Sequence, residues 1–355
     1  MSLHASSRET PTVPNTPLLY NWTDEQVARV GNANLVARHR LHELDLFSDE
    51  GLIATLEKHP LGALGVSTMG TDPVKRDEWR DGTTGGHDAA TLIEAVKNGH
   101  LWLNLRRVAD HHPEYDRIIN DLYDELESIT PGLHTYNRSG NLLVSSPSAI
   151  VYLHVDCPVN MLWHIRGEKR AFVYPIDDRV VTDEQIENVV TGTSVEEIDF
   201  RPEMDDLAEA YDLVPGDLVT WAQHTPHRVV NTAGLNVSLS TEHMTRPAAR
   251  RNNVFLANRY FRETLGWNFT STKTTGLGAA AKEFGIRVAR RLPVFTAEEP
   301  VNDNYSKSFD IDPSSPSGYR LHGEAADDAA AEAELAGPVV VGNLATSIVD
   351  SPISI

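Results

Sequence analysis

The sequence predicts an α+β protein with a mainly β core that is flanked by helices on both sides. Between Gly140 and Thr245, short β-type runs such as NLLVSS, AIVYLHVD and MLWHIRG follow one another, separated by turn residues such as Pro147, Pro158 and Pro215-Gly216. Many short strands at this spacing are typical of an antiparallel sandwich or barrel. Apolar residues at helical spacing before and after this region predict the flanking helices.

The segments before the β core alternate between helix and strand patterns. Ser48-Asp49-Glu50 predicts the start of a helix that ends at His59-Pro60. A short helix is expected over 87–97, and the alternating run HLWLNL over 100–105 predicts a strand. Apolar residues at helical spacing predict a longer helix over 113–128.

Within the β core, two further features stand out. Arg166 to Arg170 (RGEKR) lies between two β-type runs and is expected to be a hairpin turn. Gly234 is interpreted as another turn. An acidic insertion over about 177–212 either covers one mouth of the barrel or is a plain surface excursion. Helices are expected again after Thr245.

The chain divides into three expected parts. Residues 1–22 are rich in Ser, Thr and Pro and predict a mobile N-terminal arm. Residues 23–295 form one domain whose β core covers about 95–245. Residues 296–355 predict an acidic, low-complexity C-terminal tail; from Glu298 onwards there are 11 acidic and 2 basic residues.

Composition excludes several classes of partner. The 355 residues include 31 basic and 51 acidic side chains, a formal charge of -20, so nucleic acid and anionic membranes should be repelled. No run is long and apolar enough for a membrane span, and the N-terminus does not resemble a secretory signal. The single cysteine, Cys157, cannot form an internal disulfide. These observations predict a soluble, cytoplasmic protein with no nucleic-acid or membrane partner.

His154-Val155-Asp156 is the candidate for a metal site. Side chains alternate along a strand, so His154 and Asp156 are expected on the same face, where they supply two ligands of a facial triad for iron(II). The same H-x-[DE] spacing occurs at His112 and His322, but the first starts a helix and the second lies in the acidic tail. A structural role for His154 is the alternative, although a buried carboxylate beside it is costly unless paired or bound to metal.

The third ligand must come from a distant strand. In VPGDLVTWAQHTPHRVVN, a Pro-Gly turn launches one strand and Thr225-Pro226 breaks the chain before the next. His227 opens the run HRVVN and is therefore favoured as the ligand, with His224 as its competitor. In the turn over 166–170, Lys169 either points into the barrel to pair with an anion or is a solvated basic residue.

These motifs together resemble a known family. Residues 154–175, HVDCPVNMLWHIRGEKRAFVYP, resemble the core motif of JmjC-type oxygenases, in the branch that contains the asparaginyl hydroxylase of hypoxia-inducible factor and bacterial cupin-like proteins. PGDLVTWAQHTPHRVVN resembles the second metal motif of that family. The resemblance covers about residues 95–245. It implies a double-stranded β-helix, the jelly-roll or cupin barrel, and an iron(II)- and 2-oxoglutarate-dependent dioxygenase that acts as a hydroxylase.

The resemblance also implies roles for individual residues. His154, Asp156 and His227 would form the catalytic iron(II) site, and Lys169 would pair with the distal carboxylate of 2-oxoglutarate. The remaining residues implied to line the co-substrate pocket are Asn160, Trp102, Asn104 and Ser240.

Two positions depart from the family pattern. Val151 stands where the family often has Thr or Ser, and Trp102 stands where it often has Tyr. A polar contact to the co-substrate is then missing or comes from Tyr152, Ser238 or His164. The resemblance further implies a homodimer through the helices after residue 250. Two other functions stay open: a non-catalytic cupin that binds a small molecule or partner, and a metal-dependent cupin enzyme without 2-oxoglutarate. The substrate, a small molecule or a peptide, cannot be identified from the sequence.

Overall fold

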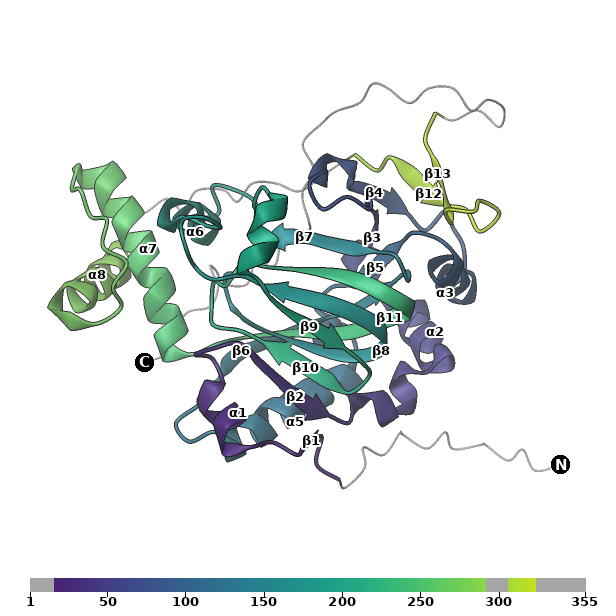
Figure 1. The fold of residues 1–355 in the computed structure, drawn as a ribbon, viewed down its shortest axis with the longest axis horizontal. Helices are drawn as coiled ribbons and strands as arrows, with labels where there is room; N and C mark the ends of the chain where they lie inside the picture. Colours follow the sequence, from purple (N-terminus) through teal and green to yellow (C-terminus); the bar gives the residue numbers. More distant parts are fainter. Residues whose placement is uncertain (1–15, 292–305, 324–355) are drawn as a thin grey trace.

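A computed structural model describes residues 16–291 and 306–323, which are organised around a large twisted sheet with helices at its sides (Figure 1). The first fifteen residues of the expected N-terminal arm lie outside the described residues. Most of the expected C-terminal tail also lies outside them.

The strands follow one another along the whole described chain. They are β1 (Leu19–Tyr20), β2 (Leu35–His39), β3 (Leu64–Thr68), β4 (Arg80–Thr83), β5 (Trp102–Leu105), β6 (Tyr136–Ser145), β7 (Ile150–His154), β8 (Val159–Val173), β9 (Glu209–Leu213), β10 (Asp217–Thr220), β11 (His227–Met244), β12 (Phe309–Ile311) and β13 (Tyr319–Leu321).

The helices lie before and after the strands of the core, and one lies within the insertion. They are α1 (Asp24–Arg29), α2 (Asp49–Lys58), α3 (Ala89–Asn98), α4 (Val108–His111), α5 (Pro113–Ile129), α6 (Asp183–Thr191), α7 (Arg246–Leu265) and α8 (Gly276–Ala289). Short 3-10 turns are η1 (Leu41–Glu43), η2 (Asp45–Phe47), η3 (Leu61–Ala63), η4 (Arg76–Glu78) and η5 (Pro202–Leu207). The expected helices over 87–97 and 113–128 correspond to α3 and α5.

Two long antiparallel strands, β8 and β11, run side by side through the centre of the fold. The first half of β8 pairs with β10 and the second half with β9, while β11 pairs first with β7 and then with β6. Each long strand therefore has different neighbours at its two ends. The main path of the sheet, here called the large sheet, has the order β1-β2-β10-β8-β11-β6-β5-β3-β4-β12-β13. β9 and β7 pair with β8 and β11 off this path, and these four strands form the branch here called the small sheet. The α+β, sheet-rich class is confirmed. The pairings among the described residues do not close into a barrel.

The expected hairpin turn over 166–170 is wrong. β8 continues through these residues without a turn, and β11 continues through Gly234. Both glycines have positive φ, +77° at Gly167 and +67° at Gly234, and the register between the strands shifts here. A glycine with positive φ can form a β-bulge as well as a turn. A β-bulge bends the strand that contains it. The two strands therefore bend here and enter the second sheet.

One face of the large sheet carries the main hydrophobic core and is covered by helices α2, α3 and α5. α5 begins with Pro113 and buries one stripe at helical spacing: Tyr115, Ile118, Ile119, Leu122, Tyr123 and Leu126. The opposite face of β8, β10 and β11 faces the small sheet, with a separate apolar cluster that includes Leu162, Val219, Trp221 and Val229. This face, here called the inner side, also carries buried polar residues such as Lys169 and Asn231.

The acidic insertion is packed against the small sheet and is not a free surface excursion. Ile198 donates its backbone N–H to Leu153, and Val155 donates its own to Glu196, so the insertion continues the edge of β7. Arg228 of β11, which is almost fully buried, pairs with Asp205 (2.6 Å) and stacks on Phe172. The insertion therefore has a fixed position beside the strand end that carries His154.

Two ends of the described chain depart from the expected division. Within the predicted arm, Leu19 and Tyr20 pair with β2 as β1. Within the predicted low-complexity tail, β12 and β13 form a hairpin, and β12 joins β4 in parallel. Phe309 is fully buried there and belongs to the main core, which explains why this part of an acidic segment is folded.

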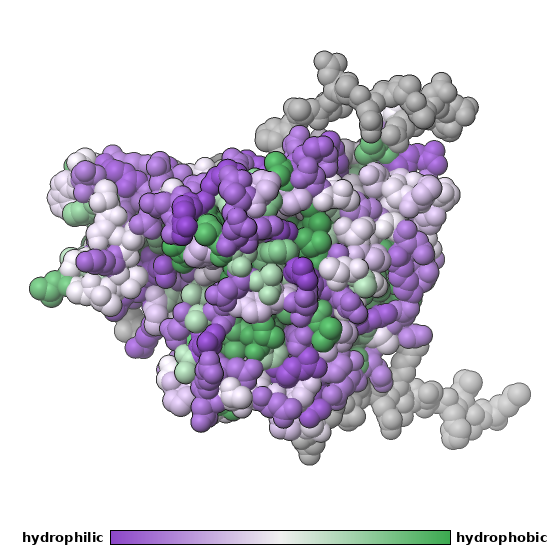
Figure 2. Space-filling view, in the orientation of Figure 1, coloured by the Kyte–Doolittle hydropathy of each residue, from purple (hydrophilic) through white to green (hydrophobic). Residues whose placement is uncertain are grey.

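Helices α7 and α8 pack together at the side of the sheets, next to α6 (Figure 1). α8 buries Ala279, Ile286 and Ala289, whereas Leu277 and Phe284 are exposed. None of the helices in the described ranges has the length and apolar composition needed to cross a membrane. The face in Figure 2 is largely hydrophilic, with apolar side chains gathered in small areas, one of them over β2 and β10.

Candidate metal and co-substrate site

Two histidines and an aspartate converge at one end of the small sheet. His154 is the last residue of β7 and His227 is the first of β11, and the two are direct cross-strand partners with ring centroids 4.1 Å apart. Asp156 follows two residues after His154. One ligand atom from each of the three residues lies within 4.8 Å of the others, and all three residues are buried.

Hydrogen bonds fix the orientation of both imidazole rings. Nδ1 of His154 lies 2.8 Å from the carbonyl oxygen of Tyr152, and Nδ1 of His227 lies 3.0 Å from that of Thr225. A carbonyl only accepts, so each Nδ1 carries a proton and Nε2 is the ring atom available to a metal. Both Nε2 atoms are on the side of Asp156: Nε2 of His154 is 3.7 Å from Oδ1 and Nε2 of His227 is 3.4 Å from Oδ2.

The Asp156 carboxylate lacks the partners that burial demands. It is 2% exposed, and neither oxygen has a hydrogen-bond partner among the described residues. Burial raises the pKa of Asp156 and lowers the pKa of His227 well below its usual value, so the ring of His227 is neutral. Two imidazoles and a buried carboxylate without a hydrogen-bond partner are a donor set that a divalent metal takes. The residues present therefore fit an iron(II) ion.

His224, the competing third ligand, does not join this group. Its Nε2 lies 2.8 Å from Oδ1 of Asn252 on α7, and its ring packs edge-on against Phe255. The ring of His227 instead stacks at a tilt on Trp221, with centroids 3.9 Å apart. The choice of His227 over His224 thus agrees with the geometry.

Lys169 is buried on the inner side of β8, next to Asn231 of β11 in the strand register. No hydrogen bond or ion pair to its ammonium occurs within the described part of the chain, and burial lowers the pKa of Lys169 to about 7. A buried cation without a partner is costly, so this position favours an anionic ligand. Lys169 is not the solvated turn residue that was the alternative.

The cavity beside Lys169 contains two polar residues that the sequence analysis missed. Asn231 donates through Nδ2 to Oγ of Ser145 (2.8 Å) and to the carbonyl of Ser146 (2.7 Å). Ser145 thus accepts one bond, while its own hydroxyl proton has no acceptor among the described residues. The cavity also contains Val151 and has an open volume of about 20 Å³, room for about one water molecule. The sequence signal was weak, because Ser145 and Asn231 are the polar residues that follow the apolar runs LLV and VV.

Of the four other expected lining residues, one lines the Lys169 cavity and three do not. Trp102 lines the Lys169 cavity. Asn160 and Ser240 are buried and hydrogen-bonded to each other, with Nδ2 of Asn160 3.1 Å from Oγ of Ser240, but neither lines this cavity. Asn104 does not line it either, and its buried Oδ1 has no partner among the described residues.

The proposed substitutes for the missing family hydroxyl lie elsewhere. The hydroxyl of Tyr152 donates to the carbonyl of Lys75 (2.9 Å) and accepts from the N–H of Gly70. His164 lies between Oγ of Ser238 (3.2 Å) and the carbonyl of Gly167 (2.8 Å). None of Tyr152, Ser238 and His164 lines the cavity that Val151 lines. Ser145 is the hydroxyl that does.

No protein-family model matches the chain, and no curated protein matches it in sequence. Solved structures of an Escherichia coli ribosomal oxygenase resemble it. One structure of that protein, YcfD, has a TM-score of 0.46 and 13% identity over 78% of this chain and 69% of that chain. Another, in complex with cobalt and 2-oxoglutarate, has a TM-score of 0.43 and 14% identity over 78% of this chain and 68% of that one.

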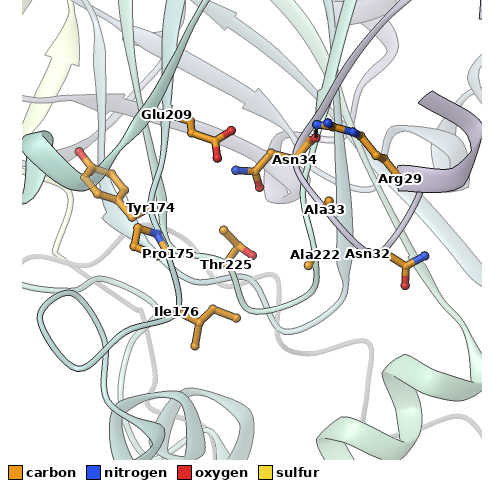
Figure 3. A pocket seen from close by; sticks show the side chains of 10 residues that line it. All are labelled: Arg29, Asn32, Ala33, Asn34, Tyr174, Pro175, Ile176, Glu209, Ala222 and Thr225. Atoms are coloured by element: carbon orange, nitrogen blue, oxygen red, sulfur yellow. Dashed lines mark hydrogen bonds between the residues drawn. The ribbon is translucent and has the colours of Figure 1, made fainter. Parts of the chain in front are cut away.

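A cleft of about 330 Å³ lies among strand ends, and Figure 3 shows the side chains that line it. Its walls are strand ends: Asn34 precedes β2, Pro175 and Ile176 follow β8, and Ala222 and Thr225 follow β10. Thr225 is shared with the metal site, since its carbonyl accepts the bond from His227. Arg29 and Glu209 add opposite charges to the rim. Its volume lies in the range of about 300–1,000 Å³ that is typical of small-ligand sites.

Cys157 is a packing residue. It is 1% exposed, and burial together with the carboxylates of Glu196, Asp156 and Glu242 raises its pKa well above the usual value. Its thiol is therefore protonated at neutral pH and unreactive.

Proposed function

We propose that this chain is an iron(II)- and 2-oxoglutarate-dependent oxygenase of the JmjC or cupin type that hydroxylates a substrate. The observation that carries the proposal is the position of His154, Asp156 and His227, whose free Nε2 and carboxylate atoms face one another in a buried site. A nearby buried lysine without a partner supports an anionic co-substrate. The two sheets that share β8 and β11 support a double-stranded β-helix.

His154, Asp156 and His227 would hold the iron(II) ion, which together with 2-oxoglutarate and dioxygen would supply the oxidation of a substrate C–H bond. The protein's own residues orient the metal ligands and shield them from water. Thr225 and Tyr152 fix the imidazoles through their carbonyl groups. The ring of Trp221 covers one side of His227 and excludes water there.

The co-substrate would be held at its distal carboxylate by Lys169 and Ser145. Lys169 supplies a compact positive charge, and Ser145 has a hydroxyl proton still available because it accepts from Asn231. The cavity is small, so it suits a terminal carboxylate group and not a whole second molecule. Val151 leaves one wall of the cavity apolar.

The cleft that Thr225 lines is proposed as the approach for the substrate. It combines charged and amide groups from Arg29, Glu209 and Asn34 with the apolar surface of Ile176 and Ala222. Such a lining suits an amphipathic molecule or the side chain of a peptide. Ala222→Trp should narrow the cleft and raise the KM for substrate, while the affinity for metal and 2-oxoglutarate stays unchanged. An unchanged KM would exclude this route.

The function is tested by anaerobic binding followed by turnover. Purified protein is titrated with iron(II) and 2-oxoglutarate without oxygen, and then given oxygen with a panel of amino acids, peptides and small molecules. Succinate and carbon dioxide should form in equal amounts, together with a hydroxylated product, and His154→Ala should abolish all three. Unchanged succinate formation in that variant would refute the proposed site.

The same experiment separates the other two functions. A metal-dependent enzyme without 2-oxoglutarate would bind iron(II) but show no binding of the co-substrate, and Lys169→Met would change nothing. A non-catalytic binding protein would bind a ligand from the panel and produce no succinate. Either result would replace the oxygenase assignment.

A further inference from the structure

The two loops that carry the metal-site residues meet at one side chain of α7. Asn252 is 2% exposed, and its Oδ1 accepts hydrogen bonds from Nε2 of Gln223 (2.9 Å) and Nε2 of His224 (2.8 Å). Its Nδ2 donates to the carbonyl of Cys157 at 3.4 Å. Cys157 directly follows Asp156, and His224 lies three residues before His227. One amide therefore connects both loops.

Gln223 completes the link between the loops. Its Nε2 also donates to the carbonyl of Cys157, at 2.7 Å. Gln223, His224 and Asn252 are all buried, so no water competes for these bonds. The carbonyl beside Asp156 thus receives two donors, one from the other loop and one from the helix.

The turn before His227 needs such support because its backbone is strained. His224 has φ of +66°, the left-handed region that residues other than glycine rarely adopt. A residue held there costs about 1–3 kcal/mol and persists only when its surroundings fix it. The bond from His224 to Asn252, and the packing of its ring on Phe255, both come from α7. The helix therefore holds the turn that aims His227 at Asp156.

We propose that Asn252 is a positioning residue for the metal site, through which α7 sets the spacing between Asp156 and His227. This inference rests on the proposed metal site, but it does not require that the protein oxidises anything. The role of His224 follows from it: this histidine belongs to the support of the third ligand. Residues that hold metal ligands by hydrogen bonds commonly change metal affinity about 10–100-fold when removed.

α7 is connected to other parts of the chain as well. Arg259 donates to Oδ1 of Asn188 on α6 (2.9 Å), and Arg262 pairs with Glu187 of the same helix. α8 packs on its outer side. Helix α7, which carries Asn252, therefore contacts the two metal loops, helix α6 of the insertion and helix α8. A shift of α7 would move the metal loops together with these elements.

The test is cobalt(II) binding to the full-length protein without oxygen, read as a dissociation constant and as the visible absorption spectrum of the bound ion. Asn252→Leu should weaken binding about 10–100-fold and change the spectrum. Asn252→Asp keeps the acceptor for Gln223 and His224 and should recover most of the affinity. Asn258→Leu is the matched control, because Asn258 is equally buried on α7 but donates to the carbonyl of Ser271 (3.2 Å), away from the metal loops. The control should lose stability to urea and bind cobalt(II) as the wild type does.

Each outcome decides the inference. Wild-type affinity and spectrum in Asn252→Leu would overturn it, and so would an equal loss in Asn258→Leu, which would mean that any loosening of α7 has the same effect. If Asn252→Leu does not fold, Gln223→Met removes the second link from the loop side, and wild-type affinity and spectrum in that variant would also overturn it. Cobalt binding without succinate formation would refute the proposed oxygenase and leave this result intact. A wild type that binds no metal would refute both.

Discussion

His154 and His227 are direct partners across β7 and β11, so the metal site is a consequence of strand register. The register shifts between His227 and Val229, which marks a bulge next to the site. A slip of one residue between these strands would turn one imidazole to the opposite face. The insertion, which extends the edge of β7 through Ile198 and Glu196, helps to hold that register.

The first prediction concerns the unpartnered carboxylate. Asp156→Asn keeps the shape but removes a buried charge whose two oxygens accept no hydrogen bond from the described residues. We expect the metal-free variant to be more stable than the metal-free wild type by about 1 kcal/mol or more, because functional sites often carry such destabilising charges. Added cobalt(II) should stabilise the wild type and leave the variant unchanged. Urea unfolding with and without cobalt(II) measures both effects.

The exposed Asp178 provides the control for that experiment. Asp178→Asn removes the same charge from the surface, so its stability and its response to cobalt(II) should equal those of the wild type. A metal-free Asp156→Asn that is less stable than the wild type would contradict the interpretation, because it would mean that the carboxylate has a stabilising partner.

The sequence was enough to select candidate metal ligands, because their choice depends only on spacing along a strand and on where a strand begins. His154 and Asp156 share a face because they are two apart at a strand end, and His227 was favoured because it opens a strand. The residues that share a cavity with Lys169 could not be foreseen in this way. Ser145, Lys169 and Asn231 meet only through the pairing of β6, β8 and β11, and a polar residue at the end of an apolar run does not reveal which strands are neighbours.

The bulge at Gly167 was misread for a related reason. A glycine with basic neighbours fits a hairpin turn and a strand bulge equally well, since both need positive φ. Only the long-range partner, the stretch of β11 around Gly234, decides between them. The folded hairpin of β12 and β13 was missed because its support also comes from far away, from β4 and the main core.

The second prediction tests the hydroxyl in the co-substrate cavity. Ser145→Ala should weaken 2-oxoglutarate binding to the cobalt(II)-loaded protein about tenfold, since a hydrogen bond to a charged group contributes about 1.5–3 kcal/mol. Val151 lines the same cavity, and threonine has nearly the shape of valine. Val151→Thr in the Ser145→Ala background should therefore restore much of the affinity. Anaerobic titration, followed by absorption or calorimetry, measures it.

Ser148→Ala is the control for this pair. Ser148 follows β6 on the surface, where its hydroxyl lies 2.8 Å from Nδ1 of His100. Its removal should leave the affinity for 2-oxoglutarate unchanged. Full affinity in Ser145→Ala, or no recovery in the double variant, would mean that the carboxylate is bound elsewhere.

The third prediction follows from the lowered pKa of Lys169, about 7 in the folded protein against 10.5 for an exposed lysine. Between these values the unfolded chain binds a proton that the folded protein does not, so metal- and ligand-free stability should rise with pH across this window. Below about pH 7 Lys169 is charged in both the folded and the unfolded chain, so the folded protein bears the full free-energy cost of the buried charge. Lys169→Met should then be more stable than the wild type by about 2–4 kcal/mol at about pH 6, and this advantage should shrink towards about pH 10.

Ligand binding should show the opposite dependence on pH. A carboxylate requires the charged form of Lys169, so 2-oxoglutarate affinity should fall by up to about tenfold per pH unit above pH 7. Calorimetry in buffers of different ionisation enthalpy should detect proton uptake on binding. Binding that is independent of pH in the wild type would show that Lys169 does not contact the ligand.

The last prediction concerns the bend that lets β8 and β11 belong to two sheets. Gly167 has φ of +77°, and a Cβ there would lie 2.7 Å from Nδ2 of Asn236 and 2.7 Å from the carbonyl oxygen of Leu235. Gly86 has the same φ of +77° but nothing within 4 Å of a Cβ. Gly86→Ala should cost about 1–2 kcal/mol of unfolding free energy from backbone strain alone.

Gly167→Ala should cost clearly more, because the clash forces the two strands apart and disturbs the side chain of Lys169 two residues later. It should also weaken 2-oxoglutarate binding, which Gly86→Ala should not. Urea unfolding and anaerobic titration of both variants measure these effects, and equal losses of stability with unchanged binding would show that the close approach of the strands does not shape the site.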